Sequence, residues 1–324
     1  MKKIIRQIAM LVATASVAMG CETEVEFRGE DMASLPVLYS VVSPEEPVRA
    51  YYSQSVFILD NGAPTDIANG TVELHINGTF RERLKMVEER SEYGNSRLYY
   101  QGETMVSPLD RVMVRACSPR FPEWVSGTTV VPEAISVGEF EVARGNTSEE
   151  GRVAGKATLP ISDPEGENYY WLESTFYVTR DPSHPYGGYS YPMNYTDVAF
   201  SSGRTNDILM DYINDSPDFA LFDDSLLEGV EEYTLSMEWD FGEYYLQYPV
   251  TFNMKCCQLD ENLFKYYRSV ELVQNGLEMF GEPVQIHTNI EGGLGLVGSR
   301  SVCVVAEVDG ATIFGEPTGP SEEW

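Results

Sequence analysis

Short segments in which apolar and polar residues alternate recur along most of the chain. Between residues 71 and 76, every second residue is valine, leucine or isoleucine, which is the pattern of a strand with one buried face. His75 falls on the polar side of this strand and is expected to face outward. Asn77-Gly78 follows directly and is the strongest short signal for a hairpin, so residues 80–87 are expected to return antiparallel.

Several such strands, separated by turns rich in Pro, Gly and Asn, fill the segment that follows residue 34. Their number and regular spacing predict an immunoglobulin-like β-sandwich over residues 35–133. The expected strands are 35–42, 48–58, 71–76, 80–87, 98–101, 111–116 and 125–131.

A larger β-rich unit is expected over residues 134–324. One amphipathic helix is predicted within it, near residues 260–279, because Asp260 can cap it and apolar residues then recur at helical spacing. The fold class is therefore mainly β, with two sandwich-like units. Strands are expected at 140–142, 153–159, 169–179 and 301–308, and a hairpin is expected from 233–239 and 244–254.

The first twenty residues have the pattern of a signal peptide. Three basic residues precede an uncharged apolar segment, 8–19, which is too short to span a bilayer. Gly20-Cys21 then fits a bacterial lipobox, so Cys21 is expected to carry a diacylglycerol and an acyl chain such as palmitate. The residue three before the cysteine is usually leucine and here is Ala18. The alternative is an ordinary secretory signal that happens to contain a cysteine.

Residues 21–34 are acidic and show little periodicity, which predicts a tether between the acyl anchor and the folded units. Two interpretations remain open for its glutamates. They can be a solvated spacer, or a surface-export signal similar to those of Bacteroidetes outer-membrane lipoproteins. No later segment has the ~18 apolar residues of a spanning helix, so acyl chains would be the only attachment to the lipid bilayer.

Composition and charge exclude several functions. The 324 residues include 22 lysines and arginines against 51 aspartates and glutamates, a net charge of −29. This charge repels nucleic acid and anionic lipid headgroups, so no nucleic-acid partner is expected. Only three histidines are present, and neither GxSxG nor HExxH occurs. We therefore expect no enzyme activity, no catalytic residue, no metal site and no cofactor.

The glycine-rich segment 292–298 invites comparison with phosphate-binding loops. No lysine followed by serine or threonine stands at the required spacing, and no βαβ unit surrounds it. Glycines also allow positive φ angles and close approach of a strand to its neighbour. The segment is therefore interpreted as structural.

Four cysteines follow Cys21, and an exported protein could oxidise them. Cys256 and Cys257 are adjacent in an expected strand, so their side chains point to opposite faces, and one of them could reach Cys303. The pair Cys257 and Cys303 is the candidate disulfide. Buried free thiols are the alternative, for these two and for Cys117.

A segment rich in Tyr, Gly and Pro, 181–195, is the best candidate for binding. Tyrosines offer flat contact area and a hydroxyl group, which suits peptides or sugars. The alternative is a lid packed over the sandwich. The candidate contact residues are Tyr186, Tyr189, Tyr191 and Tyr195.

Several segments, taken in order along the chain, form a pattern that belongs to a known family. They are Leu35-Pro36-Val37-Leu38, Ile67 to Leu74, Val130-Val131-Pro132, Asp163 to Tyr170, Leu263 to Tyr267, Glu282-Pro283-Val284 and Thr288 to Gly298. Together they resemble a Bacteroidetes family of outer-membrane lipoproteins catalogued as a domain of unknown function, DUF 4249, and the resemblance covers nearly all of the mature chain. It implies that the gene lies beside that of a TonB-dependent receptor, and hence an accessory role in nutrient uptake. It implies no catalytic residue.

The first functional hypothesis is thus a non-enzymatic accessory to a TonB-dependent receptor, lipid-anchored in the outer membrane and facing the cell surface. Two alternatives stay open at this point. One is a cell-surface adhesin or assembly component. The other is a surface hydrolase that uses carboxylates, because acidic residues are abundant and only their spacing in the fold decides that chemistry.

Overall fold

A computed structural model describes residues 34–56, 65–90, 96–147, 151–181, 187–201, 219–227, 230, 232–274 and 285–319. The fold is mainly β, as the sequence predicts. The segment predicted to be a signal peptide, Cys21 and the predicted tether as far as residue 33 lie outside the described residues, and so does Tyr186.

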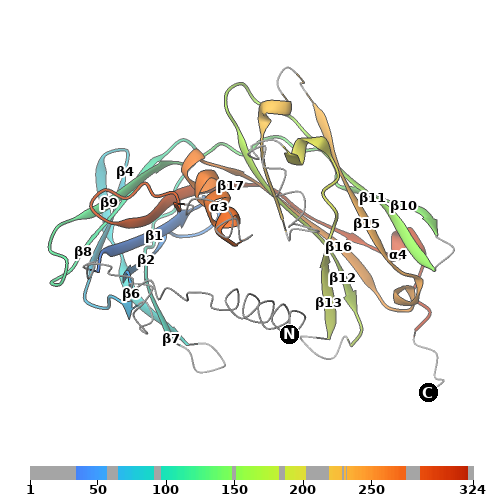
Figure 1. The fold of residues 1–324 in the computed structure, drawn as a ribbon, viewed down its shortest axis with the longest axis horizontal. Helices are drawn as coiled ribbons and strands as arrows, with labels where there is room; N and C mark the ends of the chain where they lie inside the picture. The colour runs from blue at the N-terminus through green and yellow to red at the C-terminus, as the bar shows by residue number, and fades with distance from the viewer. Residues whose placement is uncertain are drawn as a thin grey trace, which may run out of the picture.

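One sheet of ten strands extends through both halves of the molecule (Figure 1). Its strands follow the order β13-β12-β16-β17-β1-β2-β7-β6, with β14 paired to β12 and β3 paired to β2. Their bounds are β13 Gly188–Pro192, β12 Tyr169–Thr179, β16 Val250–Leu259, β17 Leu294–Asp309, β1 Pro36–Val42, β2 Arg49–Gln54, β7 Ser96–Gln101, β6 Lys85–Arg90, β14 Ala220–Asp223 and β3 Thr65–Asp66.

Strand β17 makes this sheet continuous. Its first part pairs in parallel with β1, from Leu294 opposite Val37 to Ser299 opposite Val42. Its second part pairs antiparallel with β16, from Arg300 to Asp309. A strand near the end of the chain therefore joins the first strand of the fold to the second half of the molecule.

Two smaller sheets pack on one face of the long sheet and enclose two hydrophobic cores. The first core lies under the four-stranded sheet β5-β4-β8-β9, and the second lies under the three-stranded sheet β10-β11-β15. The bounds are β5 Thr79–Arg83, β4 Thr71–Ile76, β8 Arg111–Cys117, β9 Val125–Val130, β10 Glu141–Thr147, β11 Arg152–Ile161 and β15 Tyr233–Gly242.

Both cores are closed by β17. Val297 packs into the first core, and Val304, Ala306 and Val308 pack against the second. Ile290, just before β17, also belongs to the first core. The first sandwich thus contains residues from near the C-terminus as well as those within 35–133, and the division of the chain at residue 133 stays a prediction.

Helix α3, Glu261–Gln274, covers the opposite face of the long sheet, where Leu263 and Phe264 pack against Leu296. It lies within the segment predicted to be helical, and its first turn is held by Asp260. The Asp260 carboxylate accepts hydrogen bonds from the backbone N–H groups of Asn262 at 3.1 Å and Ser299 at 2.6 Å. The cap therefore also ties the helix to β17. Among the described residues, the other helices are short: η1 Val198–Ser201, η2 Asp224–Leu226, η3 Glu243–Gln247 and α4 Ala311–Phe314.

The predicted hairpin of residues 233–239 and 244–254 is wrong. Strand β15 pairs with β11 in the three-stranded sheet, whereas β16 pairs with β12 and β17 in the long sheet. Short helix η3 lies between them. Both strands direct apolar residues into the second core, β15 from the three-stranded sheet and β16 from the long sheet, so they face each other across this core.

The glycine-rich segment has the structural role that the sequence predicts. Gly295 adopts a φ of 110° and pairs with Leu38 of β1, so closely that a Cβ at this position would overlap the Leu38 carbonyl oxygen. A Cβ on Gly298 would lie 2.9 Å from the Leu263 Cβ of α3. Glycine at these positions allows β1, β17 and α3 to pack together.

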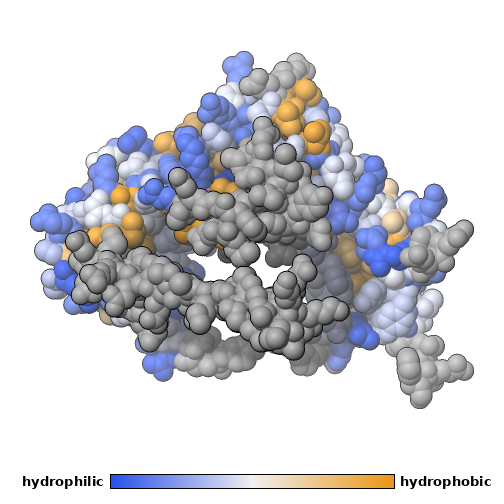
Figure 2. Space-filling model, viewed as in Figure 1, coloured by the Kyte–Doolittle hydropathy of each residue, from blue (hydrophilic) through white to orange (hydrophobic). Residues whose placement is uncertain are grey.

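The visible surface carries hydrophilic residues with separate hydrophobic patches between them (Figure 2). Among the described residues, no helix is long and apolar enough to cross a membrane.

Candidate ligand-contact surface

The four candidate tyrosines have different surroundings. Tyr195 is half-buried: its hydroxyl accepts a hydrogen bond from the Ser174 N–H at 2.9 Å, and its ring lies 5.3 Å from that of Phe200. Tyr191 is half-buried, and Tyr189 is 50% exposed. Tyr186 lies outside the described residues. Of the described three, Tyr189 is the most exposed, and Tyr189 and Tyr191 lie together in β13.

These two tyrosines belong to a strand, although the sequence predicts a loop. In β13, Tyr189 pairs with Val178 of β12 and Tyr191 pairs with Phe176. The Tyr191 ring stacks on the Phe176 ring with centroids 5.1 Å apart. The pairing fixes both rings on one face at the edge of the long sheet.

Further tyrosines meet them there, from the short helix η3 and the residue after it. The Tyr191 hydroxyl lies 3.3 Å from the Tyr245 hydroxyl. The Tyr244 and Tyr248 hydroxyls lie 3.1 Å apart, and Tyr244 is 54% exposed. Sequence reasoning missed this group because 244–254 was assigned to a strand, although three tyrosines in the five residues 244–248 were a visible signal.

Arg180, directly after β12, lies among the rings. Its guanidinium carbon is 5.7 Å from the centre of the Tyr189 ring and 5.4 Å from that of Tyr248. Its Nη2 donates to the Tyr244 hydroxyl at 3.4 Å. We call this group the arginine–tyrosine cluster; it consists of Arg180, Tyr189, Tyr191, Tyr244, Tyr245 and Tyr248.

The contacts within the cluster shift the acidity of its members. Hydrogen bonding to Tyr248 and Tyr189 raises the pKa of Arg180, so the guanidinium stays charged. Hydrogen bonding with Tyr244, and to a smaller extent with Arg180, lowers the pKa of Tyr248. A hydrogen bond to Tyr245 raises the pKa of Tyr191 to about 12. The cluster therefore presents one positive charge, that of Arg180, among tyrosine rings.

A cavity of about 120 Å³ adjoins the cluster and shares Tyr248 with it. Phe314 of α4 and Pro249 also line this cavity. Sites for whole small molecules occupy roughly 300–1,000 Å³, so this volume suits one inserted side chain. The surface can therefore offer ring faces, hydroxyl groups, a cation and a small recess to a partner.

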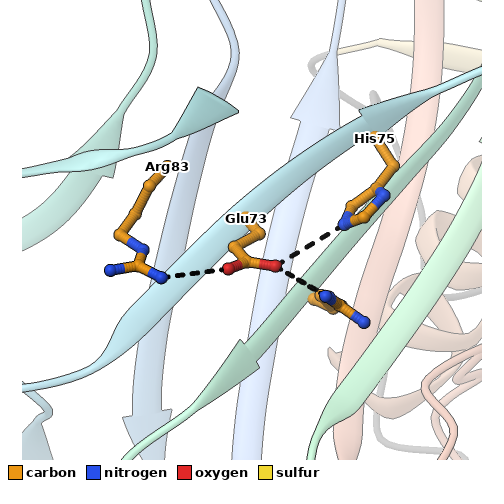
Figure 3. A network of polar contacts seen from close by, with 4 residues as sticks. Glu73, His75 and Arg83 are labelled. Carbon is orange, nitrogen blue, oxygen red and sulfur yellow. Dashed lines mark hydrogen bonds and ion pairs between the residues drawn. The ribbon is translucent and has the colours of Figure 1, made fainter. Parts of the chain in front are cut away.

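A second polar group lies on the outward face of the four-stranded sheet (Figure 3). Glu73 of β4 is only 7% exposed, and its Oε2 accepts hydrogen bonds from Nε and Nη2 of Arg115 at 3.0 and 2.7 Å. Its Oε1 accepts from Nη2 of Arg83 at 3.2 Å. Nε2 of His75 lies 3.6 Å from Oε2, and this ring faces outward as the sequence predicts.

The Glu73 carboxylate has its partners within this group. Burial alone would raise the pKa of Glu73, but the hydrogen bonds and charges of Arg115 and Arg83 outweigh burial and lower it. The carboxylate joins three neighbouring strands, β5, β4 and β8. Its arrangement supports a structural role, so we place the candidate site at the arginine–tyrosine cluster.

The predicted cysteine pair is not brought together. Cys257 packs beneath α3 with Leu259, whereas Cys303 packs against the second core on the opposite face of the sheet. Cys117 and these two are free thiols, as is Cys256. Within the described residues, no group of three or more His, Cys, Asp or Glu side chains could hold a metal ion.

Comparison with known protein families identifies the family of this chain. A family model described as "Domain of unknown function (DUF4249)" matches residues 22–303. The chain belongs to this DUF4249 family. The match begins directly after Cys21, includes the arginine–tyrosine cluster and ends within β17. The family description states no activity. No curated protein matches the chain.

Proposed function

We propose that this DUF4249 protein is an outer-membrane lipoprotein, anchored through Cys21, that serves as a non-enzymatic accessory to a TonB-dependent receptor in nutrient capture. The arginine–tyrosine cluster is the observation that carries the proposal. Tyrosine and arginine are enriched at protein interfaces and at the positions that contribute most to binding. In this protein, Arg180 and the tyrosine rings of the cluster contact one another at the surface without a partner.

The contacts within the cluster favour recognition of a partner. Tyr191 stacks on Phe176, and Arg180 contacts Tyr189, Tyr244 and Tyr248. Side chains that are ordered beforehand lose less conformational entropy when they bind. A binding role is therefore supported by both the residue types and their packing.

The position of the cluster relative to the expected anchor fits an accessory protein. The tether enters the fold at β1, and β13 lies four strand spacings away in the long sheet (Figure 1). Because β1 pairs with the first part of β17 whereas β13 is aligned with its last residues, the cluster also lies about 15 residues along β17 from the start of β1, which is ~50 Å at ~3.3 Å per residue. The cluster would thus project to one side of the anchor, toward a neighbouring receptor in the same membrane.

The acidic chain supports the same arrangement. A net charge of −29 repels anionic lipid headgroups, so the folded units are held away from the membrane surface. Arg180 is then a local positive site on an acidic protein, and it can form a charge-assisted hydrogen bond with a carboxylate of the partner.

The test is to isolate the natively anchored protein in mild detergent through a C-terminal tag and to identify the bound proteins by mass spectrometry. We expect a TonB-dependent β-barrel receptor at near-stoichiometric amount. Extraction of the protein alone, under conditions that preserve other outer-membrane complexes, would contradict the accessory role.

A further inference from the structure

The pairing of β16 with β17 contains a β-bulge at the cysteines. Cys256 lies opposite Val304, and Cys257 lies opposite Val302, so the register shifts between them. Cys303 is left without a partner of its own in the ladder. In a β-bulge, two residues of one strand oppose a single residue of the other. Cys303 and Val304 therefore both oppose Cys256.

The bulge places two thiols on the same face of the sheet. Cys256 is fully buried in the second core, and Cys303 and Val304 pack against that core. Cys257 and Val302 point to the opposite face, beneath α3. The Cys303 thiol donates a hydrogen bond to the Ser301 carbonyl oxygen at 3.9 Å, and its proximity raises the pKa of the Cys256 thiol. The adjacent pair is thus Cys256 and Cys303, with Cys257 turned away.

We propose that Cys256 and Cys303 form a cross-strand disulfide once the protein has been exported. The proposal rests on the export that the proposed function requires, because disulfides persist in oxidising compartments. The oxidant is a thiol oxidase that carries a reactive disulfide. Two thiols become one S–S bond, and their two electrons and two protons convert the disulfide of the oxidase to a dithiol.

The surroundings indicate the order of the two exchange steps. Contact with Cys256 lowers the pKa of Cys303, which is half-buried. Backbone groups of Ile135 and Gln258 lie beside the Cys303 thiol, and both residues line a cavity of about 470 Å³. The Cys303 thiolate attacks the oxidase first and forms a mixed disulfide. The Cys256 thiolate then attacks the Cys303 sulfur and releases the oxidase.

The expected consequence is a covalent link between β16 and β17 that closes a loop containing α3. Such a link removes conformational freedom from the unfolded chain. We expect the oxidised protein to unfold at a temperature roughly 10 °C higher than the reduced protein.

The test is to map the disulfide by its tryptic peptides in the protein isolated from the outer membrane. Free thiols are first blocked with iodoacetamide in acid-quenched cells. Trypsin cleaves after Lys255, Lys265 and Arg300, so the link joins peptide 256–265 to peptide 301–324. We expect this linked pair without reduction, with Cys257 alkylated. Cys257→Ser is the matched control and should keep the link, whereas Cys303→Ser should abolish it.

A second arm separates the pairing from export. The purified, reduced wild-type protein is incubated with oxidised glutathione and mapped in the same way, and the expected product is again Cys256 linked to Cys303. A link from Cys257 to Cys303, or no intramolecular link, would overturn the proposal. So would an exported protein in which both thiols are alkylated. A protein retained inside the cell would instead contradict the proposed function, and the glutathione arm would then decide the pairing by itself.

Discussion

Replacing Gly295 with alanine tests how the glycine-rich segment holds the long sheet together. Gly295 has a φ of 110°, which lies outside the regions that L-residues favour, and its pairing with β1 leaves no room for a Cβ. The backbone conformation should cost roughly 1–3 kcal/mol. Displacing the Leu38 carbonyl and its strand should cost a further ~1–3 kcal/mol. We expect Gly295→Ala to lower the free energy of unfolding by about 4 kcal/mol.

Gly166 provides a matched control because its φ is 108° and nothing lies within 4 Å of a Cβ built there. Gly166→Ala therefore carries the backbone cost alone, about 2 kcal/mol. The assay is urea unfolding, monitored by tryptophan fluorescence. The slope of the unfolding free energy against urea concentration is compared between variants, because an equal slope shows that the same amount of surface is exposed. Equal losses for the two variants would refute the steric role of Gly295 between β1 and β17.

Three further predictions concern single side chains. Because the folded state lowers the pKa of Glu73 below 4.5, its contribution to stability is present above pH 4.5 and is lost at lower pH. Glu73→Gln should thus lower the free energy of unfolding by about 2 kcal/mol at pH 7. In urea unfolding, the difference in this free energy between wild type and variant should shrink toward pH 3, and a difference that does not change with pH would contradict this. Asp260→Ala should lower the free energy of unfolding by about 1–2 kcal/mol in the same assay, whereas Asp260→Asn should keep most of it because an amide oxygen can still cap the helix. Equal losses for the two variants would exclude capping. Cys21→Ser should abolish incorporation of labelled palmitate, and labelling equal to wild type would place the acyl group elsewhere.

Local features of the fold could be predicted from the sequence because they depend on neighbouring residues. Asn77-Gly78 adopts positive φ at both positions and joins β4 to β5, as the dipeptide signals. Asp260 caps α3 because its side chain precedes the first free N–H groups of the helix. In both cases a few adjacent residues determine the conformation.

Long-range pairing could not be predicted in the same way. The parallel pairing of β1 with β17 joins residues 37–42 to residues 294–299, and no local pattern specifies this choice. The burial of Glu73 on an outward face depends on arginines from two other strands. The tyrosine-rich segment was recognised, but which rings remain at the surface depends on the register of β13 against β12.

The arginine–tyrosine cluster can be tested most directly by comparing receptor co-purification between two sets of variants. Tyr189, Tyr244 and Tyr248 are changed together to alanine, and Phe80→Ala serves as control because Phe80 is 51% exposed on the first sandwich. Matching urea midpoints show that each variant is folded. We predict that the triple variant retains less than about one tenth of the bound receptor, the effect of losing ~1.4 kcal/mol or more, and that Phe80→Ala binds as wild type. Wild-type amounts of receptor on the triple variant would contradict the assignment of this surface.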